Sequence, residues 1–201
     1  MTPAALGDRT AEQAGHELLL ALAGRVPDAA LWRLRDWLAA GATAPVGAVL
    51  PRELLRGRVA LTDAERDLLA ASAGRWGASP RLLEAVLPLD APPTSAAVFR
   101  PAPDVDTAAL CALAVVRGHA GAGDLRQTIR SGPGPEQRVL LVHAGTSPWT
   151  LTGTLQRVLR AHGDRTPCVE VLPAHGERSA YHRAAIIGAA PLWTATVAVP
   201  A

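Results

Sequence analysis

Two short segments of the chain carry the residue types that are best suited to chemistry. Residues 143–147 have the sequence HAGTS and follow a Val-rich run at 139–142, and residues 174–179 have the sequence AHGERS and follow a similar run at 168–172. If both runs are parallel strands, their carboxyl ends meet at one edge of a sheet, where open α/β folds bind ligands. The candidate ligand-binding residues at this edge are His143, Thr146, Ser147, His175, Glu177 and Tyr181.

Two interpretations of these segments stay open. Thr146, Ser147 and the nearby backbone N–H groups are able to hold an anion, because the start of a helix presents unpaired donors. Gly, Ser, Thr and His are also ordinary in tight strand-to-helix turns, where Ser147 and Ser179 are well placed to cap the following helices. In the same way, Tyr181 either contacts a ligand through its hydroxyl or covers the loop with its ring while the hydroxyl lies in water.

A nucleophilic enzyme needs a serine or cysteine that is reached by a base and an orienting acid. Ser147, with His143 or His175 and with Glu177, supplies the residue types for such a set. The chain has no Gly-x-Ser-x-Gly sequence, however. The oxyanion is usually stabilised by the backbone N–H of the residue that follows the nucleophile, and Pro148, which follows Ser147, has no N–H. The sequence therefore assigns no catalytic residue.

Cofactor and metal motifs are also missing from the sequence. It has no Gly-x-Gly-x-x-Gly, and the absence of any lysine excludes the Gly-Lys-Ser/Thr phosphate loop. His143, His175 and His182 with Glu177 do not have the close spacings of zinc ligands. We expect no cofactor and no metal, and we expect the widely separated Cys111 and Cys168 to be buried, reduced thiols.

One tryptophan in the amino-terminal part is a candidate for partner contact. In the helix expected at 28–40, the residues that face the core are Leu31, Leu34, Trp37 and Leu38, and Trp32 points away from them. Trp32, with Arg35 and Asp36 at the next helical turn, has the composition of a protein interface. Packing of Trp32 against the carboxy-terminal part of the same chain explains it equally well.

Composition narrows the possible partners of the chain. A net charge of +2 with interspersed acids and bases creates no broad field toward nucleic acid or a membrane surface. A helix-turn-helix outline over residues 62–87 lacks the basic and polar residues that read DNA. We therefore expect another protein as the partner, no nucleic acid and no membrane, and the sequence does not define the oligomeric state.

Hydrophobic periodicity predicts an α/β fold with an all-helical amino-terminal part. We expect strands at 96–100, 139–142, 168–172 and 196–199, in a small, mostly parallel, four-stranded sheet of order βαβαβαβ. Helices are expected between them at 107–117, 148–162 and 179–192, with a helical turn at 124–129 and a loop at 131–135; a buried strand at 110–116 is an alternative. A helical bundle over residues 1–90 contains predicted helices at 10–25, 28–40, 51–56, 62–74 and 79–87, and the α/β domain spans residues 95–201.

These observations support two functional hypotheses. The leading one is a non-catalytic cytoplasmic interaction or regulatory protein that uses Trp32 and its neighbours. The alternative is a small-molecule-binding protein or a small, hydrolase-like α/β enzyme with its site at the carboxyl edge of the sheet. We expect a cytoplasmic location, because residues 1–13 have neither a basic start nor an apolar region and no apolar run is long enough to span a bilayer. The Ala-, Arg- and Gly-rich composition without Lys or Asn is typical of a GC-rich bacterial coding sequence.

Overall fold

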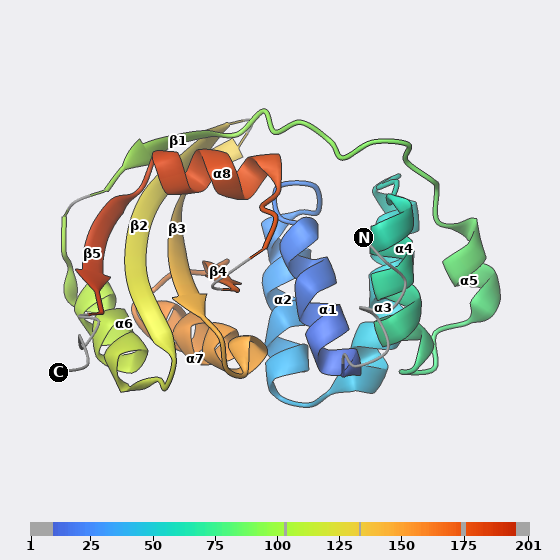
Figure 1. Ribbon diagram of the computed structural model, residues 1–201, viewed down its shortest axis with the longest axis horizontal. Coiled ribbons are helices and arrows are strands. Elements are labelled where there is room, and N and C mark those ends of the chain that lie inside the picture. The colour runs from blue at the N-terminus through green and yellow to red at the C-terminus, as the bar shows by residue number, and fades with distance from the viewer. Residues whose placement is uncertain (1–9, 103, 133, 174–175, 196–201) are drawn as a thin grey trace, which may run out of the picture. The chain divides into compact units, whose positions relative to one another are not determined.

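The computed structural model describes residues 10–102, 104–132, 134–173 and 176–195. The chain forms two compact units, Met1–Pro93 and Thr94–Ala201. The first unit is helical, and the second combines a sheet with helices (Figure 1). The division into a helical domain at 1–90 and an α/β domain at 95–201 stays a prediction.

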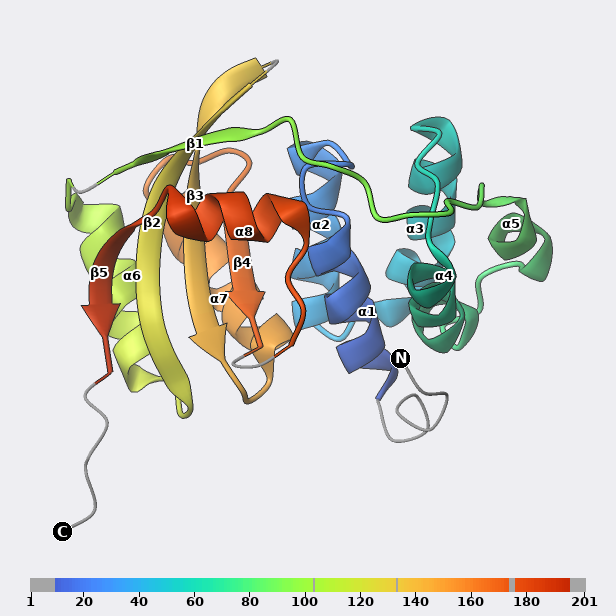
Figure 2. The ribbon, with the colours of Figure 1, turned by 45° about the horizontal axis from the view of Figure 1, so that its top comes forward.

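A mixed sheet forms the α/β unit, in place of the mostly parallel sheet that the sequence predicts. Within the described residues the strands are β1 Val98–Pro101, β2 Ala122–Gly132, β3 Gly134–Ala144, β4 Cys168–Leu172 and β5 Ala190–Thr194. The order is β1-β2-β3-β4, and β1 and β5 pair with successive stretches of β2 (Figure 2). Strands β3 and β4 are parallel, as predicted, whereas the pairs that involve β2 are antiparallel.

Strand β2 corrects the predicted helical turn at 124–129 and the predicted loop at 131–135. Leu125 is fully buried on one face, and Asp124, Arg126 and Thr128 alternate with it on the other. Because Gln127 is a polar residue on the same face as Leu125, the alternation of β2 does not stand out as a hydrophobic pattern. Strand β2 continues to Gly132 and β3 begins at Gly134, so the described residues of the predicted loop belong to these two strands, with Gly132 in register with Gly134.

The end of the chain also departs from the prediction. Helix α8 spans Ala180–Ile187, and β5 begins at Ala190, where the sequence predicts a helix that continues to residue 192. Gly188 ends α8 against Phe99, where an added Cβ would lie 2.6 Å from the Phe99 Cβ. This close approach allows the chain to turn into β5. The predicted strand at 196–199 lies outside the described residues.

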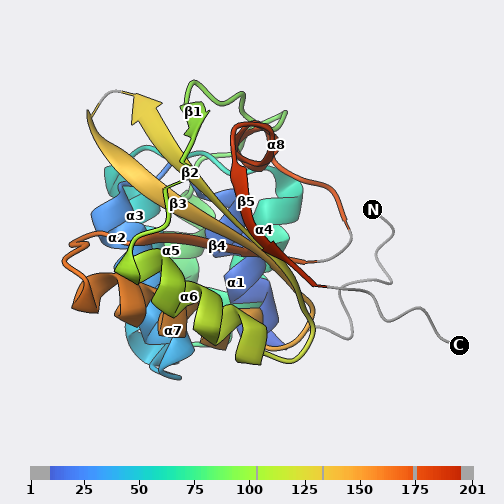
Figure 3. The same ribbon diagram turned by 90° about the vertical axis from the view of Figure 1, so that its left-hand side faces the viewer.

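Helices cover both faces of the sheet. On one face lie α6 Thr107–Gly118 and α7 Pro148–Ala161, and α8 crosses the other face (Figure 3). The core between the sheet and the first two helices includes Leu125, Leu140, Val142, Leu155 and Val169. The predicted helices at 107–117 and 148–162 are confirmed, and the alternative of a strand at 110–116 is wrong.

The helical unit buries a core of leucines. Its fully buried residues include Leu18, Leu19, Leu34 and Leu50. In the described residues of both units, no helix combines the length and apolar character needed to cross a membrane. The helices of this unit are α1 Ala11–Ala21, α2 Asp28–Ala39, α3 Thr43–Arg56, α4 Asp63–Leu69 and α5 Pro80–Ala85, and a π-helical turn, Ala70–Gly74, extends α4.

Helix α3 begins at Thr43 and not at residue 51 as predicted, so Pro51 lies inside the helix and not in its first turn. A proline within a helix removes one backbone hydrogen bond. Val46, Leu50 and Leu54, spaced four residues apart, form a fully buried stripe on α3. We attribute the continuation of the helix through Pro51 to the burial of this stripe.

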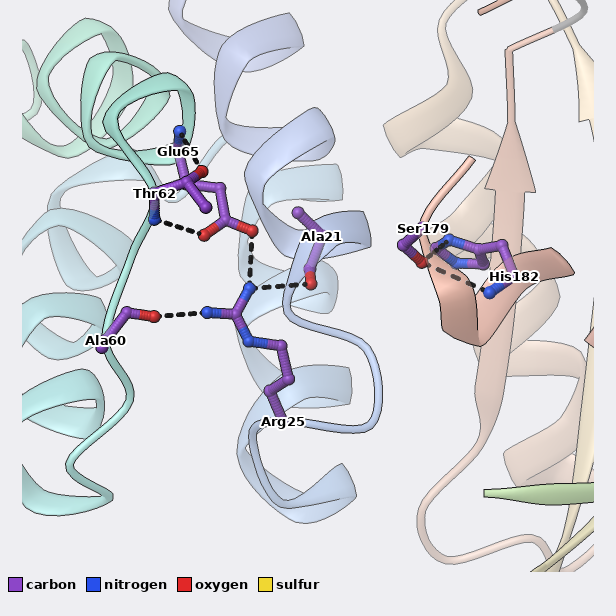
Figure 4. Close-up of polar contacts among 7 residues, drawn as sticks. All are labelled: Ala21, Arg25, Ala60, Thr62, Glu65, Ser179 and His182. Atoms are coloured by element: carbon purple, nitrogen blue, oxygen red, sulfur yellow. Dashed lines mark hydrogen bonds and ion pairs between the residues drawn. The ribbon is translucent and has the colours of Figure 1, made fainter. Parts of the chain in front are cut away.

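The predicted start of α4 at Thr62 is confirmed and is part of a larger polar network (Figure 4). The Thr62 hydroxyl accepts the Glu65 N–H at 3.4 Å, and the Glu65 carboxylate accepts the Thr62 N–H at 3.0 Å. The other Glu65 oxygen lies 2.5 Å from Arg25 Nη1, and Arg25 also donates to the carbonyls of Ala21 and Ala60. The network ties the end of α1 to the start of α4.

We predict that Gly188→Ala destabilises the α/β unit by about 1–3 kcal/mol, because the new methyl group overpacks the contact with Phe99. Urea unfolding of the purified variant measures the change. Gly118→Ala is the matched control: an added Cβ meets open space there, so we expect a change within about 1 kcal/mol. Equal stability of Gly188→Ala and wild type would contradict the close packing of α8 on β1.

Candidate functional site

The parallel pair β3–β4 brings two strand ends to one edge of the sheet. His143 is in register with Leu172, so the turn before α7 and the segment after β4 both leave the sheet at this edge. The strand direction on which the predicted site depends is therefore confirmed. His175 lies outside the described residues.

His143 forms an acid–imidazole pair with Asp124, which the sequence analysis does not identify. The two residues lie opposite each other on β3 and β2. His143 Nδ1 is 2.6 Å from Asp124 Oδ1, and the same oxygen accepts the backbone N–H of His143 at 3.2 Å. Arg126 Nε donates to the second Asp124 oxygen at 3.0 Å. The His143 side chain is 21% exposed and that of Asp124 is 11% exposed.

These contacts keep the Asp124 carboxylate charged. Burial by itself raises the pKa of Asp124, but the hydrogen bonds from His143 and Arg126 and the charges of these two side chains outweigh burial. The pKa of Asp124 is therefore below its ordinary value. At neutral pH the carboxylate is an acceptor for the Nδ1–H of His143, which leaves Nε2 as the nitrogen with a free lone pair.

The turn after β3 has a constrained backbone. Ser147 has φ 42° and ψ 54°, a left-handed conformation that is costly for a residue other than glycine. Its side chain is exposed and makes no capping hydrogen bond to α7, so capping does not explain this serine. His119 Nε2 lies 2.8 Å from the carbonyl of Thr146 and holds the turn from the end of α6.

Several polar side chains of the strands share the sheet face that α8 crosses. Leu125, Val142, Val169 and Val171 belong to the core under α6 and α7. Successive side chains of a strand point to opposite faces. Asp124, His143 and Glu170 therefore lie on the face opposite that core.

A second acid–imidazole pair lies on this same face. His182 Nε2 is 3.1 Å from Glu170 Oε2, and the two side chains are only 4% and 2% exposed. On the other side of the ring, His182 Nδ1 is 2.9 Å from the hydroxyl of Ser179 (Figure 4). Ser179 also caps α8 by accepting the His182 N–H at 3.3 Å, as predicted for a capping serine.

Tyr181 is buried against the sheet instead of facing a ligand or water. Its ring meets Phe99 edge to face at 5.1 Å, and Arg130 Nη1 donates to its hydroxyl at 3.3 Å. Burial, followed by the nearby Glu170 carboxylate, raises the pKa of the Tyr181 phenol above its usual value. Tyr181 thus has a packing role, and both interpretations of it from the sequence need correction.

The remaining predicted site residues are spread over the surface. Thr146 and Glu177 are exposed, and Thr146 lies in the same turn as Ser147. The structure therefore groups His143 with Thr146 and Ser147 at the end of β3 and adds Asp124 and His119. Within the described residues, no group of three or more His, Cys, Asp and Glu side chains is placed to hold a metal ion.

The proposed partner contact in the helical unit is only partly accessible. Arg35 is 3% exposed, and its Nη2 donates to the carbonyl of Leu19 at 2.9 Å. The Arg35 guanidinium is therefore buried in the helical unit and is not part of an accessible contact surface. Trp32 and Asp36 are each partly exposed.

A cavity of about 300 Å³ lies away from His143, near the start of β3. Its charged walls are paired within the fold: Arg138 bonds to Asp106 at 3.0 and 2.5 Å, and Gln137 donates to Asp164 at 3.2 Å. The Arg138 guanidinium lowers the pKa of Asp106. We therefore attribute this cavity to packing around the end of the β2–β3 hairpin and do not treat it as a binding site.

Comparisons with known proteins add no identification. No protein-family model matches the chain, and searches of curated proteins and of solved structures give no significant match.

We predict that Asp124→Asn lowers the free energy of unfolding by about 2 kcal/mol at about pH 7, because two charge-assisted hydrogen bonds are lost. The pKa of Asp124 is lower in the folded chain than its unfolded value of about 3.9, so this stabilisation is present above that value. It is lost as the pH falls through the folded-state pKa. The gap between wild type and variant therefore shrinks below about pH 4.

Urea unfolding at several pH values measures this gap. Asp104→Asn, at an exposed aspartate, is the control and should change stability little at any pH. A gap for Asp124→Asn that stays constant across the acid range would contradict a charged Asp124 in the folded protein.

Tyr181 offers a second test, because it is the only tyrosine in the chain. We predict that the phenolate absorbance rises only at pH values above the ordinary tyrosine pKa of about 10, since burial opposes ionisation. The same titration in concentrated urea should return to the ordinary value. An ordinary pKa in the folded protein would show that the Tyr181 ring is not buried.

Proposed function

We propose that the α/β unit binds a small polar molecule at the carboxyl end of β3 and that His143 exchanges a proton with it. The observation that carries this proposal is the 2.6 Å contact between His143 Nδ1 and the Asp124 carboxylate. A carboxylate on one ring nitrogen fixes the tautomer and orients the other nitrogen toward its target. The proposed function is therefore that of an enzyme that binds a small molecule and uses general acid–base catalysis.

The chemistry of His143 fits this role. Imidazole is the side chain that most often transfers protons in general acid–base catalysis. Nε2 of His143 takes a proton from a bound hydroxyl group or from water, and the Asp124 carboxylate stabilises the imidazolium that forms. Release of that proton from Nε2 to the ligand or to water restores the neutral ring.

The turn at 145–147 supports a ligand site beside His143. Thr146 and Ser147 are exposed residues that carry hydroxyl groups, and the backbone of Ser147 adopts a conformation that has a cost for folding. Strained backbone conformations of this kind persist only where the surrounding structure holds them in place, and they occur mainly at functional sites. These hydroxyl groups would bind polar atoms of the ligand.

A protein-interaction function through Trp32 is the second candidate. Trp32 is partly exposed, and tryptophan is enriched among the residues that dominate interface energies. Because Arg35 is buried, the proposed contact surface reduces to Trp32 and Asp36. A cytoplasmic location and a bacterial source remain predictions from the sequence.

We predict that His143→Gln abolishes the retention of a small molecule, whereas Trp32→Ala does not. Each purified variant is equilibrated with a small-molecule extract of the cells that produce the protein, and mass spectrometry identifies what the protein retains. The wild type should retain a compound, and His143→Gln should retain it at least 10-fold less. Equal retention by wild type and His143→Gln, or retention of nothing by any variant, would contradict the proposal.

The same variants test the second candidate. Affinity capture from these cells, followed by mass spectrometry of the captured proteins, compares wild type with Trp32→Ala. Loss of one specific protein only in Trp32→Ala would favour the interaction function over acid–base chemistry at His143.

A further inference from the structure

The Ser179, His182 and Glu170 side chains form one continuous hydrogen-bonded series from the surface to the interior of the α/β unit. Ser179 is partly exposed, whereas His182 and Glu170 are buried. We propose that Ser179 is the nucleophile of an acyl-transfer site that acts on carboxylic esters, with His182 as its base and Glu170 as the acid that orients the base. The site does not depend on His143 and goes beyond the function proposed above.

The hydrogen bonds define where the protons lie. In its ionised form Glu170 is only an acceptor, and the 3.1 Å contact then places a proton on His182 Nε2. Nδ1 then has a free lone pair and accepts the Ser179 hydroxyl proton at 2.9 Å. This is the arrangement of nucleophile, base and orienting acid that activates a serine, with the two ring nitrogens exchanged relative to the usual triad.

Capping of α8 does not by itself account for this arrangement. A cap requires one oxygen that accepts the His182 N–H, and Asn or Asp meets that need as well as Ser. It requires neither an imidazole nitrogen against the same hydroxyl nor a buried carboxylate behind the ring. A buried carboxylate is costly, so Glu170 calls for a reason beyond helix capping.

Ser179 also avoids the obstacle that argues against Ser147 as a nucleophile. Pro148 follows Ser147 and has no N–H, whereas Ala180 follows Ser179 and does. Ala180 and Tyr181 are the first two residues of α8, so their N–H groups have no acceptor within the helix. These donors are adjacent to the nucleophile and stabilise an oxyanion formed there.

The proposed reaction is ester hydrolysis in two steps. Ser179 Oγ attacks the acyl carbon while its proton moves to His182 Nδ1; the imidazolium then protonates the departing alkoxide as the ester C–O bond breaks. Water attacks the resulting acyl-serine and gives its proton to His182 Nδ1, and that proton returns to Ser179 as the acyl group leaves. The products are one carboxylic acid and one alcohol, and no oxidant or metal takes part.

A fluorophosphonate probe tests the nucleophile directly, because it forms a covalent adduct with activated serines. We expect one adduct per folded wild-type chain, located at Ser179 by peptide mapping, and none in urea-unfolded protein. His182→Gln should slow labelling by about 100-fold or more, since it removes the base. Ser131→Ala is the matched control: its hydroxyl meets a carboxylate, Glu136 at 3.1 Å, and it should label like wild type.

Ser179→Asn separates loss of the nucleophile from loss of the helix cap, because Asn retains capping but has no hydroxyl. This variant should keep its circular dichroism spectrum and lose both the adduct and the hydrolysis of p-nitrophenyl acetate. If the folded wild type forms no adduct at Ser179, or labels equally fast after His182→Gln, the proposal is overturned. Because labelling is read at Ser179 and ligand retention depends on His143, either proposal can fail without the other.

Discussion

The register of β3 with its two neighbours is the constraint on which both sites depend. Pairing with β2 places Asp124 opposite His143, and parallel pairing with β4 places Leu141 beside Glu170 and His143 beside Leu172. A shift of β3 by one residue would turn His143 into the core under α6 and α7. The apolar residues Leu140 and Val142, buried in that core, therefore fix the positions of the polar groups on the other face.

Two carboxylates on that face, Asp124 and Glu170, are mostly or almost completely buried, and each is paired with a histidine. A buried charge loses hydration, and the attraction of its partner often only compensates for that loss. Apolar residues of similar size would serve the stability of the sheet as well or better. We therefore connect the two acid–imidazole pairs with chemistry and the apolar core with stability.

The sequence predicts the parts of this fold that rest on apolar runs. The strands at 139–142 and 168–172 are Val-rich because they are covered on both faces, and their parallel direction follows from the helix between them. Strand β2 could not be predicted in the same way, since Asp124, Arg126 and Thr128 interrupt its apolar pattern. Pairing between Asp124 and His143 depends on a hairpin register that local spacing does not contain. Glu170 did give a signal, because a single acid inside the apolar run CVEVL requires a buried partner.

The protonation of the two imidazole rings tests the account most directly. Long-range ¹H–¹⁵N correlation spectra of the histidine rings, assigned with Asp124→Asn and Glu170→Gln, report which nitrogen carries the proton. The account predicts opposite neutral tautomers: a proton on Nδ1 in His143 and a proton on Nε2 in His182. The reverse tautomer in either ring would mean that its carboxylate does not orient it, and the acid–base role assigned to that histidine would fail.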